Sequence, residues 1–137
     1  MMQAKNEMEA IKSLNKKIAG IIESGSNDNG SYIKFSDGTM IQYGVFDTNE
    51  RDFTTEFGSV FYNNSYFGIN FPLEFINVPI ITVNEELSGY LGGNILGGLP
   101  TKSNFRVYLY TAKSATLTRN ATIYWQAIRK MEIERKK

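Results

Sequence analysis

From Tyr32 onward, apolar and polar residues alternate with a period of two, and this pattern constrains the fold more than any other feature of the chain. The last alternating run, residues 121–128, reads Ala-Thr-Ile-Tyr-Trp-Gln-Ala-Ile and holds the only tryptophan, Trp125. Successive side chains of a β-strand point to opposite faces, so these runs predict strands with one buried face. Trp125 shares its face with Ala121, Ile123 and Ala127, and we therefore expect it to lie in the core.

Turn signals separate the alternating runs. Ser36-Asp-Gly38 lies between runs at 32–35 and 39–46, and an Asp-Gly pair in this position is typical of a β-hairpin. Seven or eight short strands separated by turns predict a mainly β fold, an antiparallel β-sandwich. Besides the hairpin, we expect strands over residues 53–62, 66–71, 79–83, 105–111, 114–119 and 121–128.

The first 23 residues have a different period. Their apolar residues fit the a and d positions of heptads, which predicts an amphipathic helix over residues 1–23 that is able to form a coiled coil. A helix this short is marginally stable alone, so its apolar seam has to pack on its own domain or on other copies of the chain. The residues of the predicted trimer seam are Ile11, Leu14, Ile18 and Ile21.

Small and turn-forming residues mark the boundary after this helix. Residues 24–30, Ser-Gly-Ser-Asn-Asp-Asn-Gly, contain no hydrophobic residue and predict a linker. The β-sandwich domain is then expected over residues 31–129. A charged tail follows over residues 130–137.

Composition narrows the function classes. The 137 residues contain neither cysteine nor histidine, which removes histidine-based triads and histidine- or thiolate-ligated metal sites. We therefore expect no enzyme activity, no metal and no cofactor. A net charge of +1 gives no sign of nucleic-acid binding. No apolar run approaches the roughly 20 residues that span a bilayer, and the polar N-terminus predicts no signal peptide and no membrane insertion.

Three segments together carry a resemblance to a known family. Residues 32–44, Tyr-Ile-Lys-Phe-Ser-Asp-Gly-Thr-Met-Ile-Gln-Tyr-Gly, resemble the opening hairpin of C-terminal domains in tail-fibre proteins of tailed phages and prophages. Residues 71–75, Phe-Pro-Leu-Glu-Phe, with 79–83, Pro-Ile-Ile-Thr-Val, look like the middle segment of that family. Residues 124–128, Tyr-Trp-Gln-Ala-Ile, are similar to its closing strand, although Arg129 stands where the family has glycine.

The resemblance implies an H-type-lectin-like β-sandwich that assembles as a homotrimer and binds carbohydrate on a host cell surface. It also implies other tail or baseplate proteins as partners, and a place in the virion tail after assembly in the bacterial cytoplasm. The expected function is receptor binding by a tail fibre, multivalent and without catalysis. Two alternatives remain open: a structural trimeric tail or baseplate component with no ligand of its own, and a glycan-cleaving tail enzyme.

The most site-like segment is the glycine-rich stretch at residues 84–100, because long loops are often functional. Its carboxylates and amide are suited to hydrogen bonds with sugar hydroxyls, and its tyrosine to stacking on a sugar ring. Its leucines and Ile95 suit burial at a trimer interface equally well, with the glycines only shaping the loop. The candidate carbohydrate-binding residues are Glu85, Glu86, Tyr90 and Asn94.

Overall fold

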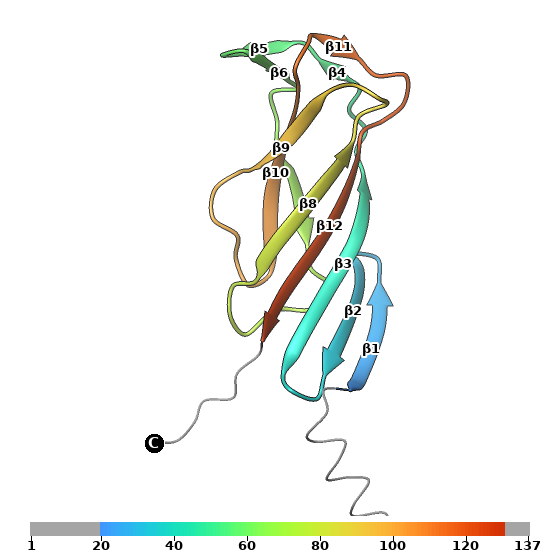
Figure 1. Ribbon diagram of the computed structural model, residues 1–137, viewed down its shortest axis with the longest axis vertical. Coiled ribbons are helices and arrows are strands. Elements are labelled where there is room, and N and C mark those ends of the chain that lie inside the picture. The colour runs from blue at the N-terminus through green and yellow to red at the C-terminus, as the bar shows by residue number, and fades with distance from the viewer. Residues whose placement is uncertain (1–19, 131–137) are drawn as a thin grey trace, which may run out of the picture.

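The computed structural model describes residues 20–130, and these form antiparallel β-strands with no helix among them (Figure 1). The mainly β prediction is therefore confirmed for this part of the chain. The predicted seam residues Ile11, Leu14 and Ile18 lie outside the described residues. The strands are β1 Ile21–Asn27, β2 Gly30–Phe35, β3 Thr39–Asp47, β4 Asp52–Phe53, β5 Thr55–Phe57, β6 Val60–Tyr62, β7 Phe67–Asn70, β8 Ile80–Glu86, β9 Gly92–Leu96, β10 Asn104–Thr111, β11 Ala115–Thr116 and β12 Thr122–Lys130.

The first sheet has five strands in the order β1-β2-β3-β12-β8. Strand β12, the last in sequence, lies in its interior and pairs antiparallel with β3 on one side and β8 on the other. Trp125 stands opposite Gly44 of β3 and Val83 of β8. The strand that carries the tryptophan is thus hydrogen-bonded along both edges.

The second sheet is built around β10. One edge of β10 pairs with β7 near its start and with β6 near its end, while β9 pairs with the other edge. Strand β5 continues the sheet beyond β6, and β4 with β11 form a separate two-stranded ribbon. Alternation on β10 buries Phe105, Val107 and Leu109 and leaves the tyrosines between and after them partly exposed.

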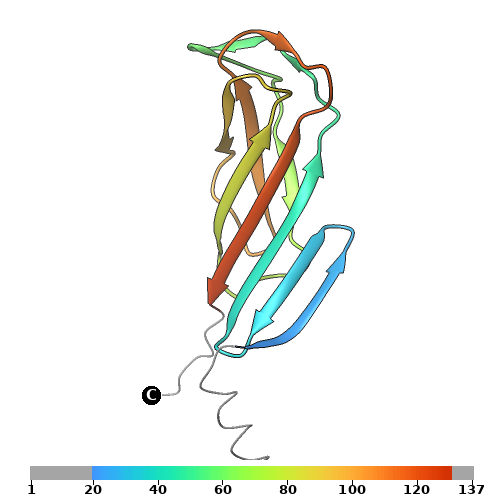
Figure 2. The ribbon, with the colours of Figure 1, turned by 45° about the vertical axis from the view of Figure 1, so that its right-hand side comes forward.

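The two five-stranded sheets face each other, and the core lies between them (Figure 1, Figure 2). Trp125 is 4% exposed and packs edge-on or tilted against Phe71 and Phe105, with ring centroids 5.7 Å apart in each pair. Ala121, Ile123 and Ala127 are fully buried on the same face. The core position predicted for Trp125 is confirmed.

The predicted Asp-Gly hairpin is also confirmed, between β2 and β3. Gly38 adopts a φ of 93°, and its N–H donates to the carbonyl of Phe35. The Asp37 carboxylate accepts a hydrogen bond of 2.9 Å from the Thr39 N–H. That backbone hydrogen bond, aided by the Thr39 side chain, lowers the pKa of Asp37.

The boundary predicted near the N-terminus is wrong for the residues that the structure describes. Residues 21–27 form strand β1, where the sequence predicted the end of a helix and a linker. The small polar residues suit an exposed edge strand, because antiparallel pairing with β2 satisfies the backbone whatever the side chains are. Asn27 stands opposite Gly30, so the residues between them are a hairpin turn. Ile21 is therefore in a strand, not on a helical seam.

The strands are more numerous than predicted. The run at 53–62 is divided into β4, β5 and β6, with a turn at Gly58, whose φ is 60°. The stretch at 84–100 contains the end of β8 and the whole of β9, so it is not a long structureless loop. A composition of glycine and small polar residues concealed a strand at both β1 and β9.

One buried side chain ties the segment after β7 to the first sheet. Gln42 is fully buried; its Nε2 donates to the Leu73 carbonyl (2.8 Å), and its Oε1 accepts from the Leu73 N–H (2.9 Å). Asn27 adds a third bond, from its Nδ2 to the Pro72 carbonyl (3.0 Å). These contacts fix the segment that places Phe71 and Phe75 in the core.

Candidate ligand-binding groove

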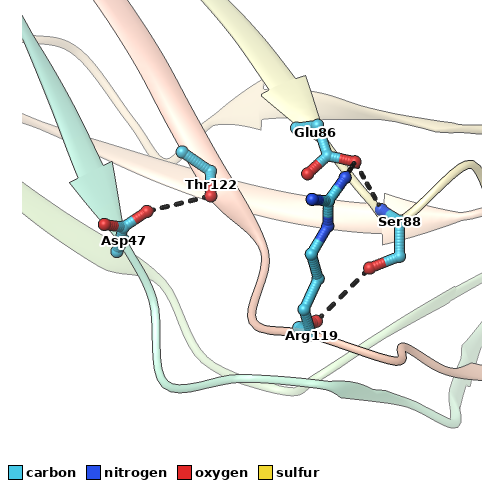
Figure 3. Close-up of polar contacts among 5 residues, drawn as sticks. All are labelled: Asp47, Glu86, Ser88, Arg119 and Thr122. Carbon is cyan, nitrogen blue, oxygen red and sulfur yellow. Dashed lines mark hydrogen bonds and ion pairs between the residues drawn. The ribbon is translucent and has the colours of Figure 1, made fainter.

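The four residues predicted to bind carbohydrate do not converge on one pocket. Glu86 is engaged at the end of β8: its carboxylate lies 2.8 Å from Arg119 and accepts from the Ser88 N–H at 2.9 Å (Figure 3). The Ser88 hydroxyl donates to the Arg119 carbonyl at 3.5 Å, and Thr122 donates to Asp47 at 2.9 Å in the same polar region. The contacts of Glu86 therefore fasten the turn after β8 to the residues before β12.

Asn94 and Glu85 are brought together, but across the two sheets. The Asn94 Nδ2 donates to the Val83 carbonyl (3.1 Å) and lies 3.5 Å from the Glu85 carboxylate. Since β8 belongs to one sheet and β9 to the other, this amide links their edges. Tyr90 lies in the turn between the two strands, where its ring is 43% exposed.

An aromatic groove lies elsewhere, on the outer face of the β10 sheet. Its volume is about 470 Å³, within the usual range for small-molecule sites. The lining residues come from β5, β6 and β10 and from β9 with the turn that follows it: Phe57, Val60, Tyr62, Ile95, Leu96, Gly97, Gly98, Tyr108, Leu109 and Tyr110. None of the four predicted residues is among them, and none of the lining residues carries a charge.

A connected row of rings crosses this face. Phe57 meets Tyr62 edge-on at 5.7 Å, Tyr62 meets Tyr108 at 6.5 Å, and Tyr108 meets Tyr66 at 6.2 Å. The Arg106 guanidinium lies over the Tyr66 ring, 4.8 Å from its centroid. Edge-to-face contacts at these distances hold rings in fixed orientations. The row therefore presents a preformed aromatic surface that ends in a cation.

Glycines of β9 and the turn after it make room for the tyrosines. A Cβ added at Gly93, which stands opposite Tyr110, would collide with the Tyr110 ring. A Cβ at Gly97 would lie 3.0 Å from the Tyr108 ring. Glycine within a strand often marks the close approach of another group. Part of the glycine-rich stretch thus belongs to the groove, whose lining side chains come from β5, β6, β9 and β10.

One part of the groove could have been predicted from the alternation of residues along β10. Tyr108 and Tyr110 alternate with three core residues on β10, which places both on the outer face. Tyr62 joins them only because β6 pairs with the end of β10, in the register Tyr62 opposite Tyr110. That pairing connects residues 48 positions apart, which no local pattern reveals.

The groove is suited to binding a ring with one apolar face. Tyrosine rings offer flat apolar surface together with hydroxyl groups that donate and accept hydrogen bonds. Pyranose sugars combine a C–H face with a rim of hydroxyls and match this surface. Among residues 20–130 there is no cluster of three carboxylates placed to hold a metal ion. The same residues include no helix of the length and hydrophobicity that crossing a bilayer requires.

Comparison with known proteins gives a structural likeness. No family model matches the chain, and no curated protein matches its sequence. An N-truncated R1-type pyocin tail fibre superposes with a TM-score of 0.54 at 13% identity, over 79% of this chain and 86% of that one. A C-terminal fragment of the R1 pyocin fibre of P. aeruginosa gives 0.53 at 13% identity, over 79% of this chain but only 28% of that one. At this identity the likeness shows a shared fold, which agrees with the tail-fibre resemblance of the sequence.

Proposed function

We propose that this chain is a receptor-binding module of a phage or prophage tail fibre that recognises carbohydrate on the host cell surface without catalysis. Three sequence segments and the fold of pyocin tail fibres support the tail-fibre assignment. The observation that carries carbohydrate recognition is the uncharged groove lined by Tyr62, Tyr108 and Tyr110. The proposed location is the virion tail, after assembly in the bacterial cytoplasm, with other tail or baseplate proteins as partners.

The proposed mode of binding is multivalent. A groove that is open on one side and has only tyrosine hydroxyls as polar groups gives weak affinity for one sugar unit. In a homotrimer, three such grooves engaging one cell surface raise the overall affinity through effective concentration. The heptad residues Ile11, Leu14 and Ile18 support this assembly from the sequence.

Single tyrosine variants test the groove. We expect Tyr108→Ala to weaken binding to host cells and to immobilised host polysaccharide by about tenfold per site, equivalent to roughly 1.4 kcal/mol. Tyr90→Ala is the control, because it removes the same type of ring, 43% exposed, from the region predicted from sequence. Both variants should keep the wild-type melting transition within a few degrees.

The control also separates the two candidate sites. If Tyr90→Ala abolishes binding and Tyr108→Ala does not, the ligand contacts the turn at residues 87–90 and the groove is not the site. If wild-type protein binds no host cell or glycan, the carbohydrate-binding proposal fails as a whole.

A second function is favoured by exposed apolar residues on β9 and on either side of it in sequence. Leu99 and Leu91 are 93% and 81% exposed, and Ile95 is 56% exposed at the groove itself. A structural tail component would bury these residues against neighbouring subunits. In that case Tyr108→Ala would change the oligomeric mass while leaving cell binding absent in both proteins.

A further inference from the structure

The aromatic row beside the groove ends in a charged side chain, Arg106. Arg106 is exposed on β10, on the same face as Tyr108 and Tyr110. Its backbone is fixed on both edges, by pairing with Gly68 of β7 and by the hydrogen bond from the Gly97 N–H to its carbonyl (2.7 Å). The Arg106 Cβ also lies close to Gly97, since a Cβ added at Gly97 would come within 3.2 Å of it.

The guanidinium is oriented but not neutralised. Gly68, opposite Arg106, has no side chain and open space above it, and the arginine lies instead over the ring of Tyr66. Within residues 20–130 the ion pairs are Lys34–Glu23 and Arg119–Glu86, so no described carboxylate compensates Arg106. A guanidinium stacked on an aromatic face keeps its N–H edge available for two parallel hydrogen bonds to an anion.

A single aromatic ring, that of Tyr66, lies between the Arg106 guanidinium and the groove residue Tyr108. Tyr66, under the guanidinium, is in edge-to-face contact with Tyr108, and Gly97 and Tyr108 both line the groove. A sugar lying on Tyr108 would therefore have an acidic substituent, or an acidic neighbouring unit, next to Arg106. The uncharged lining of the groove offers no competing carboxylate.

We propose that the groove selects saccharides that carry an anionic group, a carboxylate or a phosphate, which Arg106 binds while the sugar ring lies on Tyr108. This inference rests on the proposed function and names its ligand class. A charge-assisted hydrogen-bonded pair is about twice as strong as a neutral one, and Arg106 supplies such a donor next to the groove, through its contact with Tyr66 beside Tyr108.

The test is a titration followed by NMR, with the full-length chain and simple sugars as probes. Glucuronate, glucose 6-phosphate and glucose are added separately at the same ionic strength, and shifts of the Tyr108 ring and the Arg106 side chain are recorded. We expect both acidic sugars to bind at least fivefold more tightly than glucose, with a preference that declines as salt is raised. A difference between the two acids identifies which anion is preferred.

Two charge variants complete the experiment. Arg106→Gln is expected to bind all three sugars with the affinity that the wild type has for glucose. Arg129→Gln removes the same charge from the other sheet and is expected to keep the preference for acidic sugars. Equal binding of acidic and neutral sugars by the wild type overturns this inference but not the proposed function. The same holds if Arg129→Gln loses the preference for acidic sugars as fully as Arg106→Gln does. If no sugar shifts the Tyr108 ring, the groove is not a saccharide site and both proposals fail.

Discussion

At the scale of single residues, the structure repeatedly places an aromatic ring over a glycine on the adjacent strand. Trp125 lies over Gly44, Tyr32 over Gly25 and Tyr110 over Gly93, each pair directly opposite in register. An aromatic ring that covers a cross-strand glycine shields its backbone and helps to define the register. The same type of ring–glycine contact therefore occurs in the core, at Trp125, and on the outer face that bears the groove, at Tyr110.

Gly44→Ala should destabilise the protein through Trp125. The added Cβ would lie 2.8 Å from the indole Nε1, and the ring is confined by Phe71 and Phe105, so overpacking should cost about 1–3 kcal/mol. Gly68→Ala is the control, because its Cβ enters open space; it should be neutral or stabilising by roughly 0.5 kcal/mol. Urea denaturation measures both, and equal stabilities of the two variants would contradict the close contact.

Predictions for single residues were correct where the apolar residues of a strand alternate and the alternating face is buried. Alternation correctly predicted Trp125 in the core, and the Asp-Gly pair correctly predicted the turn between β2 and β3. It did not find the groove, because Tyr62 and Tyr108 become neighbours only through the pairing of β6 with β10. Glu86 and Asn94 looked like ligand residues by type, whereas the fold gives them partners within the chain.

At the scale of elements, the errors of prediction share one cause. Both β1 and β9 are rich in glycine and small polar residues, a composition that indicates a linker or a loop when hydrophobicity is the only guide. Both are edge strands, each paired along one side with a neighbour whose ring covers a glycine. Edge strands need no hydrophobic face of their own, so their pairing is specified by the neighbouring strand.

The contribution of Gln42 to the free energy of unfolding can be measured, because this side chain joins β3 to the segment after β7. Gln42→Leu keeps much of the side-chain volume but leaves the Leu73 N–H and carbonyl without their partner, which should cost about 2–4 kcal/mol. Gln126→Leu, an exposed glutamine on β12, is the matched control and should change stability by less than about 0.5 kcal/mol. Thermal denaturation compares them; a loss of similar size in both would show that the two bonds to Leu73 contribute nothing specific.

At the scale of the whole molecule, the two outer faces of the sandwich differ. One bears the aromatic groove, and the other carries four isoleucines in a single row across four strands, Ile33, Ile41, Ile128 and Ile80. Ile80, on the edge strand, is 66% exposed. A face of this kind and the predicted heptad seam are two separate regions through which copies of the chain could associate.

Assembly can be assigned to one of these regions by mass. Native mass spectrometry is expected to give three times the 15.5 kDa of one chain. Ile18→Asp should shift the protein to monomer, because a charge at a heptad a position disrupts the seam, whereas Ile80→Asp should leave the trimer intact. The reverse pattern would move the contact to the sheet, and a monomeric wild type would contradict the trimer.

The position of β12 has a consequence for biosynthesis. This strand follows all the other described strands in sequence, yet it lies between β3 and β8 and contributes Trp125 to the centre of the core. Until a ribosome has released residues 122–130, β3 and β8 each lack a neighbour, and the core lacks its largest side chain. Until then the edges of β3 and β8 that pair with β12 stay unpaired. The domain therefore completes folding only after nearly all of it has been synthesised.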